Sequence, residues 1–404
     1  MKKGFAHIIG FFILCSFLLT SCSGPLQNRP SVVTEDQWVS ADIFSLKGTC
    51  SEKGYYYLEN DYFLCFFDES TKKKTVLCAK AGCKHQDDSC YAYTIALPSF
   101  IFFSNGKLYT IEVSDEGCKL IQRDEDGSNR EEKLRLMNDI AIENSSITIV
   151  DYKVCKNCLY YQGNVLMETM DGELSQKVSL RRVNLDTFQE EEIYSPDKNG
   201  CSIVSVQPNK MIFHEFDAPE QTENEYDPEV YNSEEFLTKN TMKIQIWEEK
   251  DHSIRTLLET NRWETLGAIC AEEDFLYILN WDEGHQKNGV QSLNLNTMEM
   301  REVMEPKKAI DNFYKLGNYV MFYIDQRWTS YSIPDFKETN CTIFSDGYQI
   351  EQGTQNGYIV TKVLEKVSEG GFDRITKQGY YYISREDMEK GEPNYTEFYV
   401  RSYD

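Results

Sequence analysis

Histidine and the common catalytic motifs are scarce in this sequence of 404 residues. Histidine occurs five times, and only His85, His214, His252 and His285 follow the first 21 residues. The chain contains no His-Glu-x-x-His, no Gly-x-Ser-x-Gly and no phosphate-binding glycine loop. These absences remove the metalloprotease, serine-hydrolase and nucleotide-binding motifs as sources of its function.

Basic residues are also few compared with acidic ones. Lysine and arginine number 42 against 66 aspartates and glutamates, which gives a net charge of -24 at pH 7. Nucleic-acid binding depends on lysine and arginine to neutralise phosphates. We therefore expect no nucleic-acid partner, and an acidic surface that suits cationic partners or calcium.

Long apolar runs are confined to the N-terminus. Lys2 and Lys3 precede an almost wholly apolar run at residues 8–19. This run is too short to span a hydrocarbon core of about 30 Å, but it has the length of the apolar part of a signal peptide. Leu19-Thr20-Ser21-Cys22 follows, in the order typical of a bacterial lipoprotein.

We therefore expect residues 1–21 to form a lipoprotein signal peptide, removed so that the Cys22 thiol carries the lipid. Residues 22–36, rich in polar residues, glycine and proline at their start, are expected to form a flexible tether. The mature protein would then face the extracytoplasmic side of the cell membrane, with the membrane as a partner through Cys22. Loss of Lys2 and Lys3 would change its net charge from -24 to -26.

Amphipathic helical patterns are nearly absent from the remainder, which is rich in short aromatic and β-branched runs typical of strands. Seven such runs are separated by 38 to 64 residues, and they begin at positions 55, 100, 158, 211, 275, 319 and 357. A repeat of this length, made only of strands, predicts a β-propeller over residues 37–404. We expect an all-β fold of about seven blades, although six or eight also fit. A pair of β-sandwiches or a β-solenoid fits the period less well.

Polar turn segments recur between the aromatic runs. "VNLDTFQEE" at 183–191 matches "LNLNTMEMR" at 293–301, and residues 66–74 and 331–339 occupy similar places. Aspartate, asparagine, glycine and proline favour such chain reversals. Each unit is therefore expected to alternate strands and tight turns. We also expect an early strand, such as residues 37–46, to complete the last blade.

The thirteen cysteines include Cys15 and Cys22, so an odd number, eleven, remains in the body. The segment "LCAKAGCKHQDDSCYAY" at 77–93 contains Cys78-x4-Cys83-x-His85-x4-Cys90. Three thiolates and an imidazole suit a structural zinc, which would leave no position open for a substrate. A disulfide from Cys90 to Cys78 or Cys83, another metal, or reduced thiols are alternatives that the spacing leaves open.

The lipobox, the irregular aromatic repeats and this cysteine–histidine segment resemble an uncharacterised group of propeller-type cell-surface lipoproteins from anaerobic Gram-positive bacteria. In that group a similar segment follows the first blade. The resemblance implies a cell-surface location and a propeller, and it implies no reaction.

We therefore expect a non-enzymatic interaction module for a glycan, a peptide or an envelope protein. The alternative is an extracellular polysaccharide hydrolase or lyase with carboxylates in the central channel; a redox protein is a third. Residues 215–235, with nine acids and no base, predict an exposed loop whose Tyr226 and Tyr231 are candidate binding residues.

Overall fold

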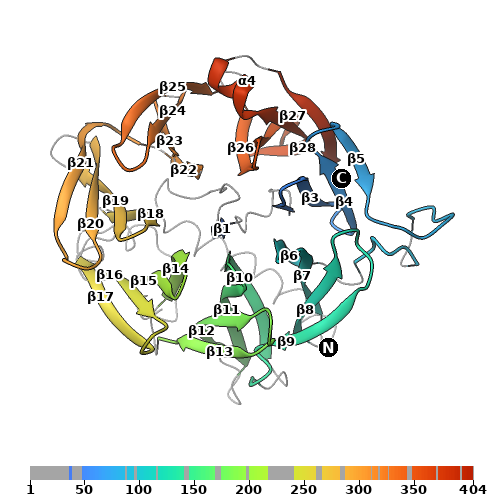
Figure 1. Cartoon of the computed structure of the whole chain (residues 1–404), viewed down its shortest axis with the longest axis horizontal. Coiled ribbons are helices and arrows are strands. Elements are labelled where there is room, and N and C mark those ends of the chain that lie inside the picture. Colours follow the sequence, from blue (N-terminus) through green and yellow to red (C-terminus); the bar gives the residue numbers. More distant parts are fainter. Residues whose placement is uncertain are drawn as a thin grey trace.

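The chain forms a ring of seven antiparallel sheets around a central axis (Figure 1). The computed structural model describes residues 36–38, 48–86, 89–94, 98–114, 117–140, 145–168, 174–196, 200–216, 241–260, 266–282, 287–310, 312–316, 319–325, 327–343, 348–369, 372–391 and 394–403. The predicted signal peptide and nearly all of the tether lie outside these residues. Within them, no helix has the length and apolar character needed to cross a bilayer.

Three sheets come from the first half of the chain, and each contains strands in sequence order. The first comprises β2 (Gly48–Cys50), β3 (Gly54–Glu59), β4 (Phe63–Asp68) and β5 (Lys73–Val76). The second comprises β6 (Pro98–Ser104), β7 (Lys107–Ser114), β8 (Gly117–Asp124) and β9 (Glu131–Leu136). The third comprises β10 (Ser145–Cys155), β11 (Cys158–Glu168), β12 (Leu174–Asn184) and β13 (Glu190–Tyr194), with β1 (Asp36–Trp38) as a fifth strand on β10.

Four further sheets complete the ring. The fourth comprises β14 (Gly200–Gln207), β15 (Lys210–Phe216), β16 (Met242–Glu248) and β17 (Ser253–Thr260). The fifth comprises β18 (Leu266–Glu272), β19 (Phe275–Asp282), β20 (Lys287–Asn294) and β21 (Met300–Lys308). The sixth comprises β22 (Asn312–Leu316), β23 (Tyr319–Ile324), β24 (Arg327–Ser332) and β25 (Lys337–Ile343). The seventh comprises β26 (Tyr348–Gly353), β27 (Gly357–Glu369), β28 (Phe372–Ser384) and β29 (Thr396–Ser402), with a short helix α4 (Arg385–Lys390) before β29.

This arrangement confirms the predicted seven-bladed all-β propeller. Because every sheet is antiparallel and sequential, its connections alternate between the two flat faces of the ring. We call face A the face that carries the connections between second and third strands and between successive blades. Face B carries the turns between first and second strands and between third and fourth strands.

The polar turns repeat in atomic detail. In the third and fifth blades, Asn184 and Asn294 each accept two backbone N–H bonds from residues two and three positions later, at 2.9–3.0 Å. The fifth residue of each turn, Phe188 or Met298, has positive φ and donates its N–H to the carbonyl of that asparagine. Asp68 in the first blade heads the same kind of turn. The sequence match between these segments therefore predicted a real structural repeat.

The hydrophobic core is divided among seven interfaces, each between neighbouring blades. Between the second and third blades, for example, Phe102 stacks on Tyr109 and also contacts Tyr152. A single sheet cannot cover both of its faces, whereas a ring covers each face with a neighbour. Each fully buried large side chain contributes about 1.5–3 kcal/mol.

The ring closes without the strand exchange expected from the sequence. Among the described residues, the outermost strand of the seventh blade is β29, which comes from the C-terminal end of the chain and pairs with β28. Closure depends instead on side chains from the two ends of the chain, including Tyr57 and Tyr399 in a shared core. Strand β1 adds to the third blade, where it lies at the centre of the ring in Figure 1. Of residues 37–46, which were predicted to complete the last blade, the structure describes Gln37 and Trp38; both pair with β10 of the third blade, so for them the prediction was wrong.

Candidate metal centre

The cysteine–histidine segment connects the first blade to the second on face A. It follows β5, and in Figure 1 the chain after β5 projects from the outer edge of the ring before it returns to β6. Cys90 is buried, whereas Cys78, Cys83 and His85 are half-buried. The three cysteines pack against the apolar core between the two blades. The site therefore lies at an interface between blades and not in the central channel.

The four predicted ligands converge. One donor atom from each of Cys78, Cys83, His85 and Cys90 lies within 4.8 Å of every other. His85 Nδ1 is 3.3 Å from Cys90 Sγ. In a tetrahedral zinc site with Zn–S bonds of about 2.3 Å, the sulfurs would be about 3.8 Å apart. A small contraction of the observed cluster would meet that geometry, so these residues fit a metal such as zinc.

A tight reversal of the backbone brings the ligands together. Gly82 has φ of 72°, in the left-handed region that favours glycine, and Cys83 N–H donates to the Lys80 carbonyl at 3.2 Å. No atom lies within 4 Å of the position that a Cβ on Gly82 would take, so its requirement is conformational. His85 also has positive φ, at 54°. The short spacing between Cys78 and His85 is therefore achieved by two left-handed residues.

The surroundings of two of the thiols differ. Burial raises the pKa of Cys90 to about 11. Burial also opposes ionisation of Cys78, but hydrogen bonds from backbone amides, together with the neighbouring thiols, outweigh it and lower the pKa of Cys78 to about 7. Since the thiolate is the metal-binding form, Cys78 is the better prepared of these two ligands in the metal-free protein. Cys78, Cys83 and Cys90 are free thiols in the structure, so the predicted disulfide alternative is not seen.

The end of the segment is fastened to the first blade as a short extra strand. Phe63 and Tyr93 form an isolated antiparallel bridge. Leu64 N–H donates to the Ala92 carbonyl at 2.9 Å, and Thr94 N–H donates to the Tyr62 carbonyl at 2.8 Å. These bonds fix the backbone that follows Cys90.

Arg123 on β8 fastens the same segment to the second blade. Its side chain is only 1% exposed. The guanidinium donates to the carbonyls of Tyr91 and Tyr93 at 3.1 and 3.5 Å. Its burial lowers its pKa to about 10, although the charge of Glu112, 3.7 Å away, opposes that shift. The buried guanidinium needs these carbonyl partners, so it holds residues 91–93 against the second blade, while their backbone bonds hold them against the first.

Tyrosine rings lie beside the cluster. Tyr62 and Tyr91 are 38% and 52% exposed. The rings of Tyr62 and Tyr93 are stacked, with centroids 5.9 Å apart and planes 10° apart. None of these tyrosines was among the candidate residues predicted from the sequence, although Tyr91 and Tyr93 lie one and three positions after Cys90. Their position next to a metal-ligand segment was the available signal.

The other sequence predictions fare differently. Cys22, Tyr226 and Tyr231 lie outside the described residues. Among the described residues, the cluster at 78–90 is the one group of three or more metal-binding side chains.

Comparison with known proteins finds only distant structural similarity. No family model and no curated protein matches the chain. An oligogalacturonate lyase in complex with manganese is similar, with 10% identity over 84% of this chain and 89% of that chain and a TM-score of 0.45. An oligogalacturonate lyase from Vibrio parahaemolyticus has 10% identity over 81% and 93%, with a TM-score of 0.47. TolB from Acinetobacter baumannii has 11% identity over 88% and 80%, with a TM-score of 0.36.

Proposed function

We propose that this chain is a membrane-anchored extracytoplasmic interaction module, lipidated at Cys22, that binds a glycan. The observation that carries the proposal is the convergence of four candidate metal ligands next to a tyrosine surface, in which Tyr62 and Tyr91 are exposed and Tyr62 stacks on the half-buried Tyr93. A zinc ion at Cys78, Cys83, His85 and Cys90 would supply a rigid cross-link. Four protein ligands would complete a tetrahedron, so the ion would be structural and would leave no position open for a substrate.

A glycan suits this surface better than a peptide. Tyrosine offers an apolar ring face together with a polar hydroxyl, which matches a sugar with C–H groups on its face and hydroxyls on its edge. The Tyr62 carbonyl accepts the Thr94 N–H, and the Tyr93 carbonyl accepts the Arg123 guanidinium of the second blade, so little backbone freedom is lost on binding. The net charge of -24 favours neutral or cationic sugars over acidic ones.

The test is binding of the purified chain to an array of neutral, cationic and acidic oligosaccharides. We expect retention on neutral or cationic sugars, weakened at least tenfold by Tyr62→Ala or Tyr91→Ala, which corresponds to about 1.4 kcal/mol. Met300→Ala, at an exposed apolar residue of the fifth blade, is the matched control and should bind normally. Binding only to peptides, or equal binding by all three variants, would contradict the proposal.

The alternative is a polysaccharide hydrolase or lyase with carboxylates in the central channel.

A further inference from the structure

We propose that the tether enters the central channel through face B, so that face B lies against the membrane and face A points outward. The inference rests on the proposed lipid anchor at Cys22 and adds an orientation to it. Its basis is the direction in which β1 runs along β10.

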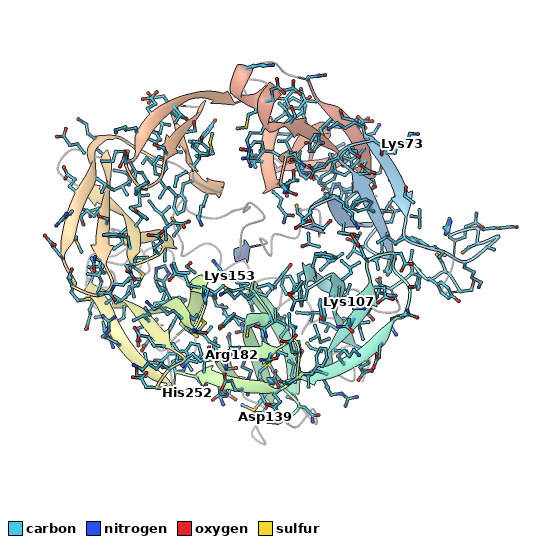
Figure 2. All side chains as sticks on the ribbon, viewed as in Figure 1. Lys73, Lys107, Asp139, Lys153, Arg182 and His252 are labelled. Carbon is cyan, nitrogen blue, oxygen red and sulfur yellow. The ribbon has the colours of Figure 1, made fainter. Side chains whose placement is uncertain are left out.

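The register of β1 sets that direction. Asp36 pairs with Cys155 and Trp38 pairs with Lys153, in antiparallel fashion. Cys155 is the last residue of β10 before the turn to β11, and this turn lies on face B. Lys153, labelled in Figure 2, lies toward the middle of the ring. The chain therefore passes Asp36 at the face-B mouth and moves into the channel as it reaches Trp38.

Strand β1 changes the face of the ring from which the tether is expected to arrive. The innermost strand of every blade, β2 included, runs from face A toward face B. A chain that led straight into β2 would arrive from face A, and a short tether would then hold face A toward the membrane. With β1 in place, the chain arrives from face B instead.

The tether is short enough for this difference to matter. Fourteen residue steps separate Cys22 from Asp36, and an extended chain spans at most about 3.3–3.6 Å per residue. The anchor thus lies within roughly 50 Å of the centre of face B. A tether that starts on the axis of the ring favours an orientation with the axis across the membrane.

The orientation exposes the proposed ligand surface. The metal-ligand segment and Tyr62 both belong to face A, because they connect successive blades and the second and third strands of the first blade. The long hairpin of β27 and β28 turns on the same face. With face B toward the lipid, these features would all point away from the membrane.

The experiment compares lysine acylation, by a membrane-impermeant reagent, of the full lipidated chain in phosphatidylcholine vesicles and in detergent. Mass spectrometry follows exposed lysines on each face. Face B provides Lys53, Lys250 and Lys337, and face A provides Lys84, Lys177 and Lys366. We expect acylation on face B to fall at least threefold in vesicles, while acylation on face A changes less than 1.5-fold.

The outcomes separate the two proposals. Protection of face A, or equal change on both faces, would overturn the orientation while leaving the anchor intact. A chain without lipid mass on Cys22 would overturn the anchor, and with it the orientation.

A pair of variants tests β1 itself. Consecutive residues of an antiparallel strand alternate in donating to their neighbour, so Gln37→Pro together with Trp38→Pro removes one N–H donor toward β10. In this variant we expect lysine acylation in vesicles to change equally on face A and face B. Gln27→Pro with Asn28→Pro, placed upstream in the tether, should retain it. Retention by both variants would overturn the role of β1.

Discussion

At the scale of single residues, the position of a cysteine in the fold decides its chemistry. Cys50, Cys65 and Cys118 are fully buried. Burial, together with a smaller effect from the negative charge of Glu190, raises the pKa of Cys118 to about 12. Such thiols act as small apolar side chains. Cys78 and Cys83 are half-buried beside His85 instead. The same residue type therefore packs the core in some blades and forms a metal-ligand set between two of them.

The metal centre provides the first prediction at this scale. We expect one zinc per chain in protein purified without oxygen, and none after Cys83→Ser, because one of four ligands is lost. At free zinc a thousandfold above its dissociation constant, binding would stabilise the fold by about 4 kcal/mol. Metal analysis and urea unfolding, with and without chelator, measure both quantities.

The matched control is Cys158→Ser, at a half-buried cysteine outside the cluster. It should retain its zinc and its response to chelator. Wild-type protein that contains no metal would contradict the assignment.

At the scale of elements, the repeated turn between third and fourth strands is a local structure with a local cause. The side chain of Asn294 accepts the N–H groups of Asn296 and Thr297, and its carbonyl accepts that of Met298. Three backbone groups that would otherwise need water are thus satisfied within five residues. Such a turn forms wherever the short sequence occurs, which is why its repetition was visible without a structure.

We expect Asn294→Ala to lower the free energy of unfolding by about 1 kcal/mol, the usual net value of a lost hydrogen bond. Asn294→Asp preserves the acceptor and should remain close to wild type. Urea titration provides the measurement, and Asn296→Ala, at an exposed side chain in the same turn, is the control. Full stability of Asn294→Ala would show that the side chain does not stabilise the turn.

At the scale of the whole molecule, the ring is closed by contacts between residues more than 300 positions apart. Asn60 N–H donates to Tyr399 Oη at 3.1 Å, and the Tyr399 hydroxyl donates to Asn60 Oδ1 at 3.3 Å. Arg401 forms an ion pair with Asp61, and the ring of Tyr399 packs against Tyr57. The first and last blades therefore meet through a buried core that is rich in tyrosine.

We expect Tyr399→Ala to cost about 3–5 kcal/mol, because it leaves a cavity in this closing interface. Tyr399→Phe keeps the ring, loses the hydroxyl, and should cost only about 1 kcal/mol. Unfolding in denaturant, followed by tryptophan fluorescence, measures both variants. A loss below 1 kcal/mol for the alanine variant would show that closure does not depend on this cluster.

Periodicity made the all-β architecture and an approximate number of blades predictable, because strands and tight turns follow from interactions among neighbouring residues; the structure fixed the number at seven. The ligand set at Cys78, Cys83, His85 and Cys90 was predictable for the same reason, since all four lie within thirteen positions. The tyrosine surface was not predictable, because Tyr62 and Tyr93 meet only when the segment after Cys90 returns to the first blade.

The sequence by itself therefore determined the repeating blades, their turns and the cysteine–histidine cluster that could hold a metal, all of which depend on local chemistry. Only the tertiary structure decided that Arg123 holds the metal-ligand segment, that β1 pairs with β10, and that side chains close the ring. These contacts join residues far apart in the chain. Their free energies depend on burial and on strand register, which exist only once neighbouring blades have packed together.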